Sequence, residues 1–99
     1  MSKLKLIIEN KAESDMELIA DFIAKDNKNA ATKMLKHFYK AFEKLTEYPN
    51  IGVKRPDFTH KNVKFYVLKK NYLIIYATFE DSIHILRVLT AYQDICALL

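Results

Sequence analysis

Three apolar segments in the second half of the chain follow one another with very short gaps, and this spacing limits the folds available to the chain. They cover residues 63–68, 72–79 and 82–89 and are rich in Val, Ile, Tyr and Phe. β-branched and aromatic side chains favour strands, and gaps of two or three residues allow only hairpin connections between them. The sequence therefore predicts three consecutive antiparallel strands.

Two amphipathic helical patterns precede these strands. The apolar side of the first pattern consists of Ala12, Met16, Leu18, Ile19, Phe22 and Ile23. Its acidic side, which we expect to face water, consists of Glu13, Asp15, Glu17 and Asp21. The apolar side of the second pattern consists of Ala31, Leu35, Phe38, Phe42 and Leu45. Steps of three and four residues place side chains on one helix face, so these patterns predict two helices packed as an antiparallel hairpin.

Capping residues and helix breakers mark the ends of these helices. The candidate N-caps are Asn10 or Ser14 for the first helix and Asn27 or Asn29 for the second. Pro49 ends the second helix, and Gly52, the only glycine, is expected to turn the chain.

A further strand is predicted at residues 3–9, KLKLIIE, as the neighbour of the last strand. The result is one domain over residues 1–99 with an α+β fold in the order β-α-α-β-β-β. We expect the helical hairpin to pack on one face of a mainly antiparallel four-stranded sheet. The predicted core includes Ile7, Ile19, Phe22, Ile23, Leu35, Phe38, Phe42, Ile75, Ile85 and Val88.

Several classes of protein are disfavoured by composition. The longest apolar run has eight residues, against about 20 for a membrane span, and charged residues near the start argue against a signal peptide. Cys96 is the only cysteine, which excludes an internal disulfide and suits a cytoplasmic location. The three histidines, His37, His60 and His84, lack metal-ligand spacing, and one glycine cannot build a phosphate-binding loop. We expect no metal and no cofactor.

Positive charge is concentrated between residues 54 and 70. The net charge of the chain is +4, and this segment contains six basic residues against Asp57 alone. Such a local field favours a polyanion or an acidic protein as partner, although a solvated basic rim gives the same pattern.

Arg87 is the most informative single residue, because a guanidinium inside an apolar strand needs a partner. One interpretation is a structural ion pair with Asp94 or Glu9. The other places Arg87 on the sheet face away from the helices, with Lys64 within reach across the sheet, where it could grip a phosphate or carboxylate. The candidate binding surface then consists of Lys64, Lys69, Lys70, Arg87 and Tyr92.

Ordered segments along the chain resemble the RelE/ParE superfamily of toxins from bacterial type II toxin–antitoxin pairs, most closely its ParE branch. The matching segments are AESDMELIADFIAKDN, LTEYPNIGVKRP, NYLIIY, ILRVL and QDICALL. The resemblance covers nearly the whole chain, and the family fold that it implies agrees with the order derived above.

The resemblance implies two modes of action for such a toxin. Members that cut messenger RNA on the ribosome carry basic residues and a late histidine or tyrosine, for which the candidates here are Arg87, Tyr92 and Lys64. Thr90 stands where that histidine is frequent and Gln93 where an arginine is usual, and neither can replace the proton transfer or the charge. ParE-like members are instead thought to inhibit DNA gyrase by binding it.

We therefore expect a toxin that binds DNA gyrase and is neutralised by a cognate antitoxin within a toxin–antitoxin hetero-oligomer. The alternatives are a ribosome-dependent endoribonuclease acting on messenger RNA, and a degenerate member that binds its antitoxin but has lost toxicity. No membrane partner is expected.

Overall fold

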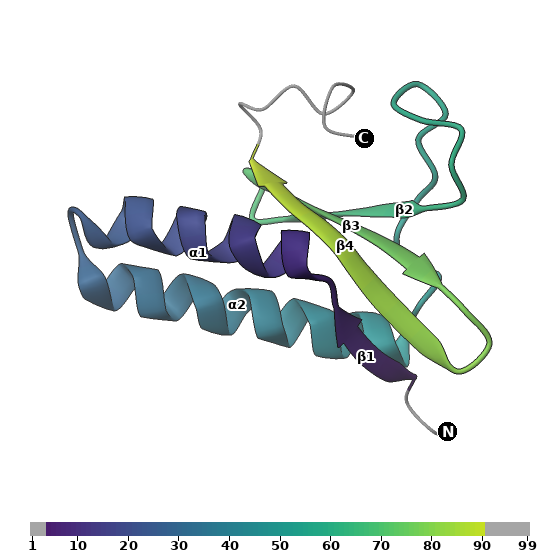
Figure 1. Ribbon diagram of the computed structural model, residues 1–99, viewed down its shortest axis with the longest axis horizontal. Coiled ribbons are helices and arrows are strands. Elements are labelled where there is room, and N and C mark those ends of the chain that lie inside the picture. The colour runs from purple at the N-terminus through teal and green to yellow at the C-terminus, as the bar shows by residue number, and fades with distance from the viewer. Residues whose placement is uncertain (1–3, 91–99) are drawn as a thin grey trace.

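In the computed structural model, which describes residues 4–90, two helices lie side by side on one face of a four-stranded sheet (Figure 1). The elements in chain order are β1 (Lys5–Ile8), α1 (Asn10–Ala24), α2 (Lys28–Glu47), β2 (Lys64–Leu68), β3 (Tyr72–Thr78) and β4 (Ser82–Thr90). The α+β fold predicted from the sequence, with its order β-α-α-β-β-β, is confirmed. Within residues 4–90, neither helix is both long and apolar enough to cross a membrane.

The strands are arranged in the order β1-β4-β3-β2. β2 pairs antiparallel with β3, and β3 pairs antiparallel with β4, through the short hairpins that the sequence predicts. β1 lies beside β4, as expected, but runs parallel to it. A parallel pair requires a long connection, and the helical hairpin is part of that connection. The sheet is therefore mixed, with two antiparallel pairs and one parallel pair.

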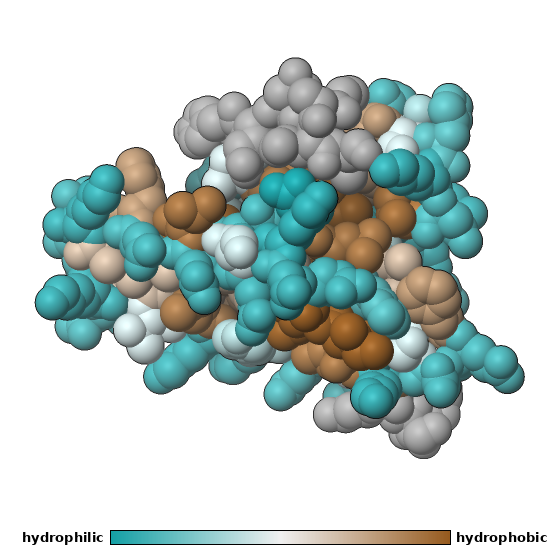
Figure 2. Space-filling model, in the orientation of Figure 1, coloured by the Kyte–Doolittle hydropathy of each residue, from teal (hydrophilic) through white to brown (hydrophobic). Residues whose placement is uncertain are grey.

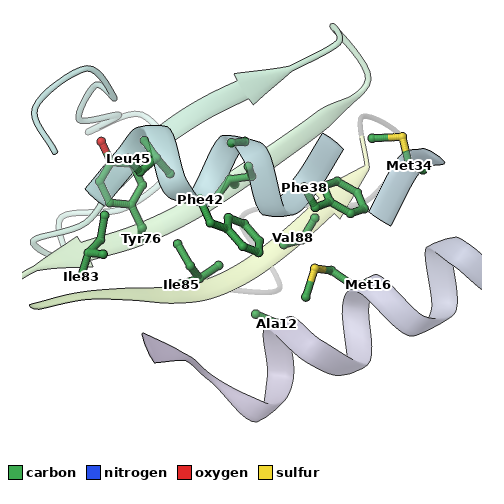
Figure 3. Packing of buried hydrophobic residues seen from close by; sticks show 12 residues of the cluster. Ala12, Met16, Met34, Phe38, Phe42, Leu45, Tyr76, Ile83, Ile85 and Val88 are labelled. Carbon is green, nitrogen blue, oxygen red and sulfur yellow. The ribbon is translucent and has the colours of Figure 1, made fainter. Parts of the chain in front are cut away.

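The main core lies between the helices and the sheet, and Figure 3 shows side chains from both layers converging there. Phe38, Phe42 and Leu45 of α2 are fully buried against Ile85 and Val88 of β4. A second cluster occupies the other face of the sheet and consists of Val63, Phe65, Leu73, Ile75 and Leu89. Both faces of β3 and β4 are therefore apolar, which explains their nearly continuous apolar sequences.

The predicted core needs correction at some positions. Phe22 is 73% exposed, so its assignment to the core was wrong. With about 100° of rotation per residue, Phe22 lies about 100° around α1 from the side formed by Ala12 and Met16, which are buried. Ile75 is buried as predicted, but in the second cluster. The predicted core residues that are only partly buried are Ile7, Ile19, Ile23 and Leu35.

One of the predicted helix caps is present. The Asn27 side chain accepts a hydrogen bond of 3.0 Å from the Ala30 N–H and caps α2. α1 instead begins after Glu9, whose side chain makes no capping bond, so the assignment of its cap to Asn10 or Ser14 was wrong. The Glu9 N–H donates to the Ile85 carbonyl at 2.9 Å, so the chain passes from pairing with β4 directly into the helix.

Candidate functional site

An ion pair between α1 and β4 joins the helical layer to the sheet. Arg87 Nε donates to Asp15 Oδ2 at 2.8 Å, and Arg87 Nη2 donates to Asp15 Oδ1 at 2.9 Å. The Val88 N–H donates to the same Oδ2 at 3.0 Å. The Asp15 side chain is 9% exposed and that of Arg87 is 18% exposed. The hydrogen bond with Asp15 raises the pKa of Arg87, which stays charged.

The position of this pair follows from the geometry of β4. β1 pairs with β4 only as far as Ile85, so no strand among residues 4–90 lies beside the rest of that edge of β4. A register shift places Ile85 opposite Tyr76 and Arg87 opposite Ile75, which leaves Leu86 as an extra residue in a β-bulge. The bulge keeps Arg87 out of the helix-side core, and at this edge of β4 Asp15 accepts hydrogen bonds from the Arg87 guanidinium and the Val88 N–H.

Both expectations for Arg87 therefore need revision. Glu9 is not its ion-pair partner, because the Glu9 carboxylate contacts His84 Nδ1 at 3.2 Å, and Asp94 lies outside the described residues. Arg87 pairs with Ile75 of the second cluster, on the face away from the helices, but its guanidinium is bonded to Asp15 of α1 and Lys64 is not beside it. Asp15 was wrongly expected to face water. At 100° per residue, Asp15 lies about 60° around α1 from Ala12, which is buried. This position on the helix is the sequence signal that could have placed Asp15 near the sheet.

The predicted basic surface is not assembled within residues 4–90. Lys64 lies on β2, separated from β4 by β3, and its Nζ donates to Asn50 Oδ1 at 2.6 Å. Lys64 pairs with Tyr76, which belongs to the helix-side core, so strand alternation does not bring it to Arg87. Lys69 and Lys70 lie in the β2–β3 turn. Tyr92 lies outside the described residues.

Two hollows flank the ion pair. The first, the α1 groove, has a volume of about 430 Å³ and lies between α1, the start of β3 and the end of β4. Its lining consists of Asp15, Leu18, Ile19, Phe22, Ile23, Asn71, Tyr72, Val88 and Thr90. Leu18 is 69% exposed and Phe22 is 73% exposed. Figure 2 shows hydrophobic side chains interrupting the hydrophilic surface along α1. An apolar groove of this kind fits apolar side chains of another protein chain.

The second hollow, of about 420 Å³, lies on the other side of the ion pair. Its lining consists of Glu9, Asn10, Lys11, Lys61, Val63, Ile75, Leu86 and Arg87. RNA cleavage needs a base for the ribose hydroxyl and an acid for the leaving oxygen. Among the described residues of this lining, the Glu9 carboxylate is the only group that could accept a proton near neutral pH, and His84 contacts it.

A comparison with known protein families shows to which family this chain belongs. Residues 6–95 match the model for the ParE toxin of the type II toxin–antitoxin system parDE. The chain belongs to the ParE toxin family. The resemblance seen in the sequence is thereby confirmed, and the arginine on the last strand of this ParE member is the one paired with Asp15.

Solved structures share the ParE fold found here. One, of the chromosomal ParDE TA system from P. aeruginosa, has a TM-score of 0.74 at 21% identity and covers 89% of this chain and 96% of its own. Another, a conserved hypothetical protein from Helicobacter pylori, has a TM-score of 0.50 at 13% identity, with 91% and 97% covered. At these identities the likeness concerns the fold alone. No curated protein sequence matches this chain.

Proposed function

We propose that this ParE family member is a cytoplasmic toxin that inhibits growth by binding DNA gyrase, and that a cognate antitoxin neutralises it in a hetero-oligomer. The observation that carries the choice of binding over chemistry is the arrangement around Arg87. Its guanidinium is committed to Asp15, and Lys64 contacts Asn50 two strands away. The cations expected for phosphate chemistry are therefore separated, whereas inhibition by binding requires no proton transfer.

The α1 groove is the surface that we assign to the antitoxin. Exposed apolar side chains that lie together in a groove, as Leu18 and Phe22 do, are typical of a protein–protein interaction site. A disordered antitoxin segment that folds on binding would place apolar side chains in the groove, between α1 and the β2–β3 hairpin. This assignment requires a small antitoxin-like open reading frame adjacent to the gene.

Expression of the toxin alone tests its mode of action. Gyrase supercoiling and ribosome-dependent cleavage of translated messages are measured on the same preparation. We expect supercoiling to be inhibited and messages to stay intact. Cleavage that is abolished by Tyr92→Phe would contradict binding inhibition and support the endoribonuclease alternative. Absence of both effects, with retained antitoxin binding, would identify a non-toxic antitoxin-binding member.

Substitution in the α1 groove tests the antitoxin site. Phe22→Ser removes an exposed ring, so we expect little change in stability but a loss of antitoxin affinity of about tenfold or more, as for an interface anchor. Val67→Ser on β2 is the matched control, because Val67 is 58% exposed but lies on the far edge strand. Equal affinities of the two variants for the antitoxin would place its site elsewhere.

A further inference from the structure

A row of basic side chains runs along the exposed side of α2, away from both hollows. Lys33, His37, Lys40 and Lys44 recur at steps of four, three and four residues, which places them on one helix face. The buried residues of α2, including Phe38 and Phe42, lie on the opposite side. The row spans about 16 Å at 1.5 Å per residue. We call these residues together with Lys69 the α2 lysine row.

Lys69, in the turn of the β2–β3 hairpin, adds a further positive charge beside this row. The pKa of His37 is lowered from its ordinary value, first by desolvation and then by Lys69, Lys40 and Lys33, so these cations act on the same imidazole. Lys44 Nζ lies 5.9 Å from the centre of the Tyr66 ring on β2. Within residues 4–90, no carboxylate forms an ion pair with Lys33, Lys40, Lys44 or Lys69. The charged side chains within the row are therefore all positive.

Holding these charges together lowers the stability of the free protein. Neighbouring lysines repel one another, and among the described residues none of the lysines in the row forms an ion pair with a carboxylate. Lys69 and Lys70 also have φ values of 52° and 66°, in a region of backbone conformation that favours glycine and asparagine. Costly conformations of this kind are concentrated at functional sites. A bound polyanion would remove the repulsion.

The chemistry of the row favours a nucleic acid backbone over an acidic protein. Lysine is depleted from the centres of protein–protein interfaces, which are built around apolar and aromatic anchors. Among residues 4–90, the most exposed large apolar side chains, Leu18 and Phe22, lie on α1. Binding to phosphates needs only cations. The length of the row, about 16 Å, corresponds to about five nucleotides of one strand at 3.4 Å each.

We propose that the α2 lysine row binds the sugar–phosphate backbone of a nucleic acid without regard to base sequence. This activity is additional to the antitoxin and gyrase binding proposed above and does not depend on either. It also differs from the basic surface expected from the sequence, because Arg87 and Lys64 take no part in it. Lys69 is the one residue that the two surfaces share.

Fluorescence anisotropy with a labelled 20-base-pair DNA of mixed sequence tests the proposal on the full chain. The triple variant Lys33→Gln, Lys40→Gln, Lys44→Gln should bind about tenfold or more weakly at moderate salt. Its plot of log K against log salt concentration should be less steep by nearly three units, about 0.9 per lost phosphate contact. The matched control is Lys5→Gln, Lys11→Gln, Lys54→Gln, which removes the same charge from exposed positions elsewhere. Equal losses in both variants would overturn the proposal, because net charge alone would explain binding.

Two further readouts on the wild-type protein locate the ligand and identify its class. Because phosphates favour the imidazolium, bound DNA should raise the pKa of His37 in an NMR titration, with His60 and His84 as internal references. Protons are then taken up on binding at pH values near that pKa. An unchanged His37 pKa in the saturated complex would place the DNA elsewhere. Polyglutamate of matched charge should bind at least about tenfold more weakly than DNA, and equal binding would favour an acidic protein as the ligand.

Discussion

At the level of single residues, the Asp15–Arg87 pair makes the strongest prediction about stability. Asp15→Ala leaves a guanidinium that is 18% exposed without its carboxylate and leaves the Val88 N–H without its acceptor. We expect a loss of about 2–4 kcal/mol in the free energy of unfolding, measured by urea denaturation. Asp21→Ala, at an exposed acidic position of the same helix, should change stability by no more than about 0.5 kcal/mol.

A second measurement separates structure from function at Arg87. Arg87→Met combined with Asp15→Leu replaces the pair by apolar groups, and the double variant should lose less stability than the sum of the two single variants. If the loss of toxicity parallels the loss of stability in the two single variants and the double variant, the role of Arg87 is structural. A stable double variant without toxicity would show that the guanidinium also serves the target.

Gly52 is required by a close approach of two segments rather than by its backbone conformation. The Tyr76 hydroxyl accepts a hydrogen bond from the Gly52 N–H at 2.9 Å and donates one to the Pro49 carbonyl at 2.9 Å. No glycine among the described residues has a positive φ. The expectation that Gly52 serves mainly to turn the chain therefore misses its main role.

Gly52→Ala should destabilise the fold, because the added methyl group would lie only 2.7 Å from Tyr76 Cε1 and 2.9 Å from Cζ. We expect a loss of about 1–3 kcal/mol in thermal or urea unfolding. Tyr76→Phe should cost a similar amount by leaving two polar backbone groups without their partner. Because the two substitutions disrupt the same contact, their effects should not add. Full additivity would contradict this account of Gly52.

At the level of elements, the β2–β3 turn is strained by its own sequence. Lys69 and Lys70 both have positive φ, whereas asparagine or glycine adopts this conformation at lower cost. Lys70→Gly should therefore raise the free energy of unfolding by about 0.5–1 kcal/mol. Lys70→Gln is the control, because it removes the charge but keeps the conformational cost. If both variants gain equally, charge repulsion rather than backbone strain limits the turn.

The bulge in β4 decides which residues of that strand reach the helices. Ile83 and Ile85 belong to the helix-side core, and regular alternation would add Arg87 to them. The extra residue, Leu86, moves the alternation by one position, so Val88 packs in that core and Leu86 joins the opposite cluster. A strand without the bulge would direct the arginine into the apolar core.

At the level of the whole molecule, we expect the main core between the helices and the sheet to contribute most to stability, because it contains the largest cluster of buried residues. Phe38 is fully buried, and its ring lies 5.4 Å from that of Tyr72 in an edge-to-face arrangement. Phe38→Ala should cost about 3–5 kcal/mol in the free energy of unfolding. Leu18→Ala is the contrasting variant, since Leu18 is 69% exposed and should tolerate truncation with little loss. A small effect at Phe38 would mean that the helices are not needed to cover the sheet.

The helices and strands, their order and the packing of the helices on the sheet could all be predicted from the amino-acid sequence. These follow from local rules, because the periods of apolar residues and the short gaps at residues 69–71 and 80–81 allow few alternatives. The partner of Arg87 and the exposure of Phe22 depend instead on how distant segments pack. Asp15 and Arg87 are 72 residues apart in the chain, and they meet where β4 has a bulge and where its pairing with β1 has ended. Neither the bulge nor the open edge can be predicted from the pattern of apolar residues. A bulge breaks strand alternation, and the length of the open edge depends on how far a distant strand extends.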